Sequence, residues 1–187
     1  MSAKKKKTKL KKLTTIKRNL HKQWSALVRG RADFCCELCG IKKGDINRNG
    51  KKEKIDAHHL LVKEIKNSPL KYEILNGVSV CTFCHKFGIP SFHRDPIRTV
   101  TWLQQNRPER YNFVIQNADI KVDLENRKIL EEIESRLANG LSLDLERLKL
   151  IEEQFPRKKK VKIEGSLFEN LDDEESESEE SSSSSEG

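Results

Sequence analysis

The sequence predicts an α+β fold in which a small, zinc-stapled core is flanked by helices and by disordered charged tails. Three observations lead to this prediction. Two cysteine pairs, Cys36-Glu37-Leu38-Cys39 and Cys81-Thr82-Phe83-Cys84, are separated by segments of strand-like composition. Apolar residues recur at helical spacing after the second pair, and the chain ends are rich in lysine or in acids and serine. The 187 residues allow one modest domain with appendages.

The N-terminal segment, residues 1–25, is strongly basic and contains no acid. Such an arm is expected to stay outside the core, disordered or helical only on contact, and to bind polyphosphate through counterion release. It could instead be a solubilising tail or a nuclear-localisation signal. The side chains expected to contact nucleic acid are Lys4, Lys5, Lys6, Lys7, Lys11, Lys12, Lys17 and Arg18.

The two cysteine pairs have the spacing of a structural zinc site. Two residues between paired cysteines let both thiolates reach one ion, so Cys36, Cys39, Cys81 and Cys84 supply four sulfurs. Cys35 could replace Cys36, but only Cys36 has the two-residue spacing. The alternative is that these thiols are buried apolar groups or form disulfides. Nothing at the N-terminus resembles a signal peptide, and a reducing compartment favours metal over disulfides.

The segment between the cysteine pairs contains two adjacent histidines. The stretch Ile55–Val62 is typical of a short buried strand, which directs His58 and His59 to opposite faces. One imidazole can then bind a metal while its neighbour remains available as a base. Leu75–Val80 indicates a turn followed by a β-branched strand, and His85–Phe87 is expected to open a helix or a helical turn.

The order of these motifs resembles the HNH endonuclease superfamily. The resemblance rests on His58-His59-Leu60, on Asn76 at the start of Asn-Gly-Val-Ser-Val, and on a second cysteine pair that adjoins His85. His59 corresponds to the first histidine of the signature, Asn76 to the asparagine and His85 to the last histidine. The resemblance covers roughly residues 31–105. It implies a ββα-metal core, which is a two-stranded hairpin packed on a helix around one divalent cation.

The resemblance also implies a role for each residue in phosphodiester cleavage. His59 is expected to be the general base, with Asn76 positioning the loop or the far ring nitrogen of that base. His58 and His85 are expected to bind the catalytic cation, Mg²⁺ or another divalent ion, with His93 as a candidate third ligand. Such chemistry needs a deprotonated water and a cation that neutralises the phosphate, and a neutral imidazole suits the first task.

Several of these residues have alternative roles. Phe92-His93, Arg94-Asp95-Pro96 and Thr101-Trp102-Leu103 resemble a segment of small phage-type HNH nucleases, but His93 could instead cap the helix that begins near Pro96. Asn76-Gly77 could serve only as a tight turn. Asp56 precedes His58 by two residues, so it could bind the metal or hold an imidazole by a hydrogen bond.

Helices are expected after the zinc core. Helical spacing and end signals predict them over Pro96–Leu103, Pro108–Gln116, Asp123–Asn139 and Leu141–Phe155. The last two could pair as a hairpin against the core or another protein. The expected domains are a basic arm (1–25), an HNH nuclease domain (26–122), a helical hairpin (123–156), and a basic linker with an acidic, serine-rich tail (157–187).

The combined features favour an HNH-type hydrolase that cleaves DNA, in phage or mobile-element recombination or genome processing. The alternative is a non-catalytic, zinc-stabilised nucleic-acid-binding module, which would not need the histidines and Asn76 together. The basic segments favour backbone recognition, and the acidic tail could compete with DNA or simply be solvated. No apolar run is long enough to cross a membrane, so we expect a cytoplasmic protein, or a nuclear one if the source is a eukaryote or its virus. A protein partner could bind the C-terminal helices or tail.

Overall fold

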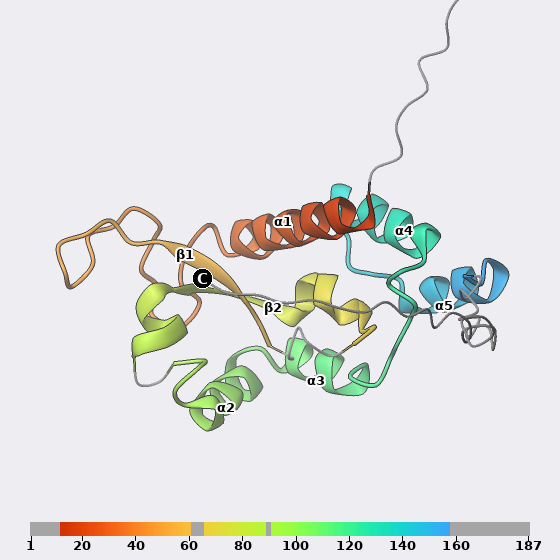
Figure 1. The fold of residues 1–187 in the computed structure, drawn as a ribbon. Helices are drawn as coiled ribbons and strands as arrows, with labels where there is room; N and C mark the ends of the chain where they lie inside the picture. Colours follow the sequence, from red (N-terminus) through yellow and green to blue (C-terminus); the bar gives the residue numbers. More distant parts are fainter. Residues whose placement is uncertain (1–11, 61–65, 89–90, 158–187) are drawn as a thin grey trace, which may run out of the picture. The chain divides into compact units, whose positions relative to one another are not determined.

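The computed structural model describes residues 12–60, 66–88 and 91–157. These residues belong to one compact unit that ends at Arg157, while the second unit, Lys158–Gly187, lies outside the described residues. The predicted linker and acidic tail, and the lysines of the arm before Lys12, therefore also lie outside them. The architecture is α+β, with a two-stranded sheet and surrounding helices (Figure 1).

Two antiparallel strands form the sheet, as the sequence predicts. β1 (Ile55–His59) pairs with β2 (Gly77–Cys81) in a register that places Ile55 opposite Cys81 and His59 opposite Gly77. Two short helical turns, η1 (Pro69–Tyr72) and η2 (Ile74–Asn76), precede β2. A π-helical turn, η3 (Phe83–Phe87), follows it and confirms the helical turn expected at His85. The end of the predicted first strand, from residue 61, lies outside the described residues.

The prediction that residues 1–25 stay outside the core is wrong for residues 13–25. They belong to α1 (Leu13–Arg31), whose buried residues Ile16, Leu20, Trp24 and Val28 recur every four positions and enter the larger hydrophobic core. The face of α1 that carries these four residues can be buried because the cations of the helix lie on its other faces. Lys17, one of the expected DNA contacts, forms an ion pair with Glu125 instead.

Gly77 is required for the close approach of α1 to the sheet rather than for a tight turn. Its backbone is extended, with φ −117° and ψ 148°. A Cβ atom at this position would lie 2.2 Å from Cγ2 of Val28. The alternative that Asn76-Gly77 serves only as a tight turn is therefore not supported by the backbone conformation.

The C-terminal half forms the four expected helices. They are α2 (Pro96–Asn106), α3 (Pro108–Gln116), α4 (Arg127–Ala138) and α5 (Leu145–Gln154). The last two begin later than predicted because Asn126 and Asp144 are their N-caps, each accepting a backbone N–H bond. α4 and α5 pack in the larger core together with α1 and η1. Among the described residues, no helix is long and apolar enough to cross a membrane.

A second, smaller core surrounds the strands. Its buried residues are Cys36, Ile55, Val78, Val80, Cys81 and Cys84, with Phe92 and Trp102 packed against it. So few apolar side chains stabilise a structure weakly, and small cores of this kind are commonly supported by a metal or by disulfides. Three of the six are cysteines of the two pairs.

Candidate metal centres

The four cysteines of the two pairs lie close together. Their sulfur atoms are all within 4.8 Å of one another, and Sγ of Cys39 is 3.8 Å from Sγ of Cys81. Sulfurs in a tetrahedral zinc site, with Zn–S near 2.3 Å, are about 3.8 Å apart. Three of the four cysteines are buried, and every cysteine is free of disulfides. The arrangement is compatible with a metal such as zinc, and the described cysteines form no disulfide.

Cys35 lies outside this cluster, as its spacing predicts. Its Sγ is 3.4 Å from the carbonyl oxygen of Asp33, and its own carbonyl oxygen accepts a 2.8 Å hydrogen bond from the Ser79 hydroxyl. Cys36, by contrast, is buried beside the second pair and bonds through its amide to the Ile41 carbonyl at 2.9 Å. Cys36 is therefore the first cysteine of the cluster.

The thiols of the cluster also have the chemistry of a cation site. Hydrogen bonding from Cys84 lowers the pKa of Cys36 to about 5, whereas burial raises the pKa of Cys81 to about 11. Four crowded thiols cannot all ionise without a positive charge close by, because like charges disfavour one another. A bound cation removes this restriction, because coordinated thiols are deprotonated.

Glu37, between the first two cysteines, holds that pair on the sheet. Oε1 of Glu37 accepts the amide of Ser79 at 2.9 Å, and the carboxylate forms an ion pair with the buried Arg110. Arg31 and Arg107 lie 3.8 and 3.5 Å from its oxygens. Burial acts to raise the pKa of Glu37, but Arg110 and the amide hydrogen bond hold it below its usual value. The sequence analysis did not identify this residue.

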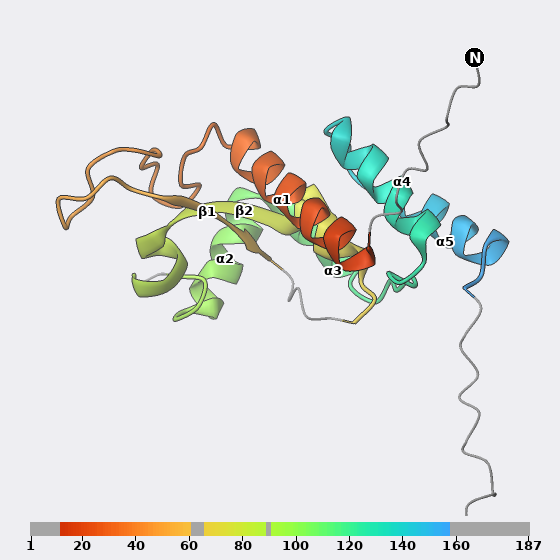
Figure 2. The ribbon, with the colours of Figure 1, turned by 45° about the horizontal axis from the view of Figure 1, so that its top comes forward.

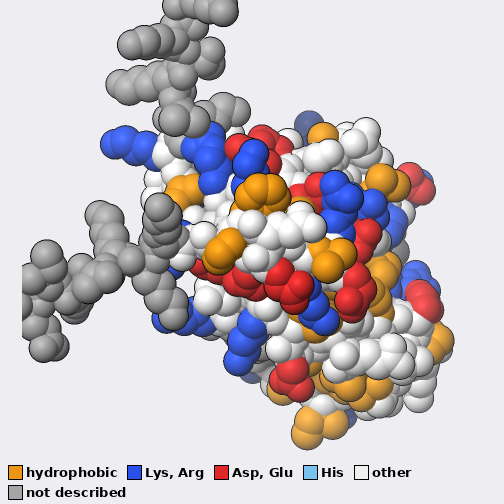
Figure 3. Space-filling model, turned by 90° about the vertical axis from the view of Figure 1, so that its right-hand side faces the viewer, with side chains coloured by type: hydrophobic (Ala, Val, Ile, Leu, Met, Phe, Trp, Pro, Cys, Tyr) orange, Lys and Arg blue, Asp and Glu red, His pale blue; other side chains and the backbone are white. Residues whose placement is uncertain are grey.

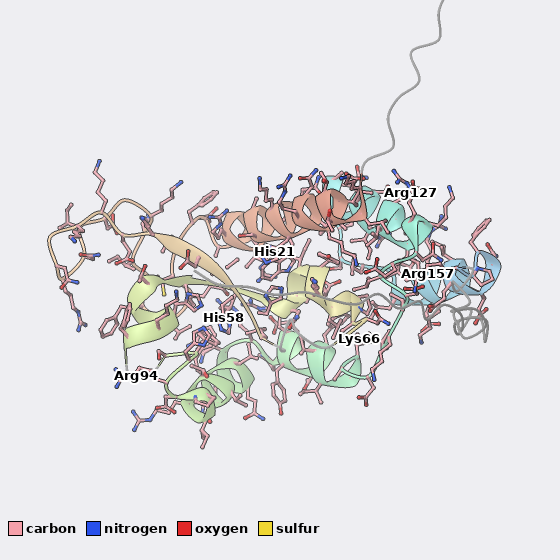
Figure 4. All side chains as sticks on the ribbon, in the orientation of Figure 1. His21, His58, Lys66, Arg94, Arg127 and Arg157 are labelled. Carbon is pink, nitrogen blue, oxygen red and sulfur yellow. The ribbon has the colours of Figure 1, made fainter. Side chains whose placement is uncertain are left out.

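Three histidines form a second cluster. His58 from β1, His85 from η3 and His93 from the loop before α2 each direct a ring nitrogen to within 4.8 Å of the others. Nε2 of His85 is 3.2 Å from Nε2 of His93. The ring centroids of His58 and Phe92 lie 4.9 Å apart. Figure 4 shows His58 on the α2 side of the strands, whereas His21 lies on the α1 side. The structure thus brings together the three histidines named as candidate ligands.

His58 is suited to metal binding. Its Nδ1 is buried and has no hydrogen-bond partner among the residues that the structure describes. Burial, reinforced by the charges of His85 and His93, lowers the pKa of His58 to about 3. A ring that stays neutral at ordinary pH keeps a lone pair for a cation. His93 does not cap α2, because Oδ1 of Asp95 accepts the Arg98 amide at 3.1 Å and is the cap.

Asp56 holds His85 rather than joining the cluster. Its Oδ2 is 3.3 Å from Nδ1 of His85. Since a carboxylate accepts, Nδ1 carries the hydrogen, and the Nε2 lone pair points to the other histidines. Carboxylates behind metal-binding imidazoles commonly have this function. Burial lowers the pKa of His85, and Asp56 partly opposes that shift.

His59 faces the opposite side of β1, as the strand pattern predicts. Its ring stacks on Trp24 with centroids 3.7 Å apart and planes 10° apart, and it is 9% exposed. Nε2 lies 3.0 Å from the Lys71 carbonyl. A carbonyl only accepts, so Nε2 donates this hydrogen bond. The structure does not bring His59 into the histidine cluster.

Asn76 positions the loop between the strands. It is buried, its Nδ2 donates to the Leu70 carbonyl at 2.9 Å, and its own carbonyl accepts the Leu60 amide at 2.9 Å. Leu70 and Lys71 are neighbours in η1, so Asn76 holds the turn whose Lys71 carbonyl orients His59. This is the first of the two roles expected for the asparagine.

Comparison of the chain with protein-family models, with curated proteins and with solved structures found no match. The function is therefore inferred from the two clusters and their surroundings.

Proposed function

We propose that the protein is a metal-dependent nuclease that hydrolyses DNA phosphodiester bonds. In this proposal the four cysteines hold a structural zinc ion, and His58, His85 and His93 hold a catalytic divalent cation. The observation that carries the proposal is the convergence of the imidazoles of His58, His85 and His93, of which His93 is exposed. A further histidine, His59, follows His58 on β1. Zinc sites with four protein ligands are typically structural, whereas sites with three leave a position for water or substrate. The resemblance to HNH endonucleases supports the same division.

A bound cation would polarise the phosphate and stabilise the leaving oxygen. His59 would act as the general base that takes the proton of the attacking water. Among the described residues β1 pairs with β2 alone, so its other edge has no partner strand. A phosphate along that edge would meet His58 on one face of the strand and His59 on the other.

The burial of His59 supports a second candidate function. A histidine stacked on Trp24 and bonded to a backbone carbonyl is also what a core histidine looks like. In a non-catalytic, zinc-stabilised nucleic-acid-binding module His59 would be structural. The convergence of His58, His85 and His93 would then have no function, and for this reason we favour the nuclease.

Plasmid nicking distinguishes the two candidates. We expect the wild-type protein to convert supercoiled plasmid to the nicked form in Mg²⁺ or Mn²⁺. His85→Ala should abolish nicking and retain zinc, because it removes a ligand of the second site only. His21→Ala is the matched control, because His21 is exposed on α1 outside the cluster. A wild-type protein that binds DNA but never nicks it, or a His85→Ala variant that nicks normally, would contradict the nuclease proposal.

A further inference from the structure

A projecting loop before β1, residues 42–54, is the most basic segment in the described part of the chain outside α1. We name it the basic finger (Figures 1 and 2). In both views this orange loop extends away from the helices. Its two acids are Asp45 and Glu53, of which Glu53 is buried. Its six cations, all exposed, are Lys42, Lys43, Arg48, Lys51, Lys52 and Lys54.

The basic finger is an ordered element. Two β-bridges, Cys35 to Lys42 and Ile46 to Lys52, hold its sides together. The Glu53 amide donates to the Asp45 carbonyl at 2.7 Å, and the turn at its tip uses Gly50 at φ 69°. All these contacts involve backbone groups, so the lysine side chains are free to vary without loss of the loop. A preorganised loop also loses less entropy on binding than a disordered arm does.

The cations of the basic finger are not neutralised by the acids beside them. Asp45 accepts the Lys42 backbone amide at 2.8 Å, and Glu53 accepts the backbone amides of Thr82 and Lys54, both at 3.1 Å. Within the described ranges, none of the six cationic side chains forms an ion pair with a carboxylate. The finger therefore presents a concentrated positive field.

The side of the molecule that carries α4 and α5 differs. There, lysines and arginines are intermingled with acids (Figure 3). Arg127 lies 3.1 Å from Glu131, and Arg147 lies 2.9 Å from Glu132. Cations that are paired with carboxylates produce little net positive field. This face therefore provides a control, because the same number of cations can be removed from it as from the basic finger.

The basic finger is also connected to the histidine cluster through η3. A pocket of about 710 Å³ has Arg48 on one wall and Phe83 and Phe87 of η3 on another. The Arg48 guanidinium lies over the Phe83 ring, 4.7 Å from its centroid. The same turn carries His85 into the histidine cluster. A polyanion bound along the finger would thus pass the turn that supplies a candidate metal ligand.

We propose that the basic finger is the main double-stranded DNA contact of the described chain, and that its lysines and Arg48 bind phosphates flanking the one at the histidine cluster. This inference takes its substrate, DNA, from the proposed function. Duplex DNA fits a dense cationic loop because its phosphate charge density is twice that of one strand, and each neutralised phosphate releases more counterion.

The test is the salt dependence of duplex binding. One variant combines Lys42→Gln, Lys43→Gln, Lys51→Gln and Lys52→Gln. The control combines Arg127→Gln, Lys128→Gln, Arg147→Gln and Lys149→Gln, which removes the same charge from the paired face. Affinity for a labelled duplex is measured by fluorescence anisotropy between low and moderate salt, without added divalent cation, so that the measurement does not depend on cleavage.

The finger variant should bind at least about tenfold more weakly at moderate salt. Its slope of log K against log salt, which is negative, should decrease in magnitude by up to about 3.6, or about 0.9 per lost contact. The control should match the wild type. If the finger variant does not fold, Lys51→Gln with Lys52→Gln should show about half the change in slope. An unchanged slope in the finger variant, or an equal loss in the control, would overturn the proposal. Finger-dependent binding without any nicking would overturn the proposed function alone.

Discussion

The cysteine cluster and the histidine cluster share η3, which carries both Cys84 and His85, but they differ in how completely protein ligands surround the metal position. The cysteine cluster has four candidate ligands, three of them buried, whereas the histidine cluster has three, and His93 is exposed. Four protein ligands complete the coordination of zinc, while three leave room for water or a phosphate oxygen. The difference supports our proposal that the first cluster serves the fold and the second serves chemistry.

The surroundings of the two clusters differ in the same way. Cys36, Cys81 and Cys84 make up half of the small core around the strands. His58 and His85, by contrast, are partly exposed, and His93 is exposed. Removing a cysteine ligand should therefore affect folding, whereas removing a histidine ligand should affect activity.

The largest expected effect is that of Cys84→Ser. Structural zinc contributes about 10–16 kcal/mol in zinc-finger peptides, which is comparable to the whole stability of a typical domain. The variant should lose zinc and its cooperative thermal transition, as judged by circular dichroism and metal content. Cys35→Ser is the control, because Cys35 lies outside the cluster, and it should behave as the wild type. A Cys84→Ser protein that retained zinc and melted normally would remove the structural role of the cluster.

His59→Ala tests whether His59 is the general base of the proposed nuclease. If His59 is the general base, nicking should fall by about 10²–10⁴-fold, while zinc content and Mn²⁺ binding persist. Because the ring also stacks on Trp24, the assay should be made well below the melting temperature of the variant. His21→Ala removes a ring whose centroid is 5.8 Å from that of His59 but leaves His59 in place, so it should retain activity. Equal nicking by His59→Ala and the wild type would assign His59 to the core instead.

Asp56→Asn should have the smallest of these effects. The change removes the negative charge beside Nδ1 of His85, while the asparagine side chain keeps the shape of the aspartate. Mn²⁺ affinity or nicking should therefore fall by about 10–100-fold. Calorimetric Mn²⁺ titration measures this loss. Asp119→Asn, at an exposed position after α3, is the control. If Asp56→Asn bound Mn²⁺ as tightly as the control, Asp56 would have no part in holding the ligand.

Much of the local structure could be predicted from short-range signals. The two-residue spacing selected Cys36 over Cys35, and strand periodicity placed His58 and His59 on opposite faces. Pro96 and Pro108 mark the starts of α2 and α3 because proline is favoured in a first helical turn.

Other features depend on contacts between distant residues, and local patterns did not identify them. The lysines of residues 1–25 favoured a disordered arm over a buried helix. The sequence does contain the signal for α1, which is the four-residue spacing of Ile16, Leu20, Trp24 and Val28. The ion pair of Glu37 with Arg110 joins residues 73 positions apart, so no local pattern indicates it. The position of His93 depends on how the loop before α2 folds back, and spacing alone left its role open.

The most direct test is to locate the metals by anomalous diffraction from crystals soaked in Mn²⁺. The account predicts a zinc peak among the four cysteine sulfurs and a manganese peak bound by nitrogens of His58, His85 and His93. Water or phosphate oxygens should complete the coordination of manganese. The contradicting result is zinc at the cysteines but no manganese at the histidines, under conditions in which the protein nicks DNA. That result would rule out the division into a structural site with four protein ligands and a reactive site with three.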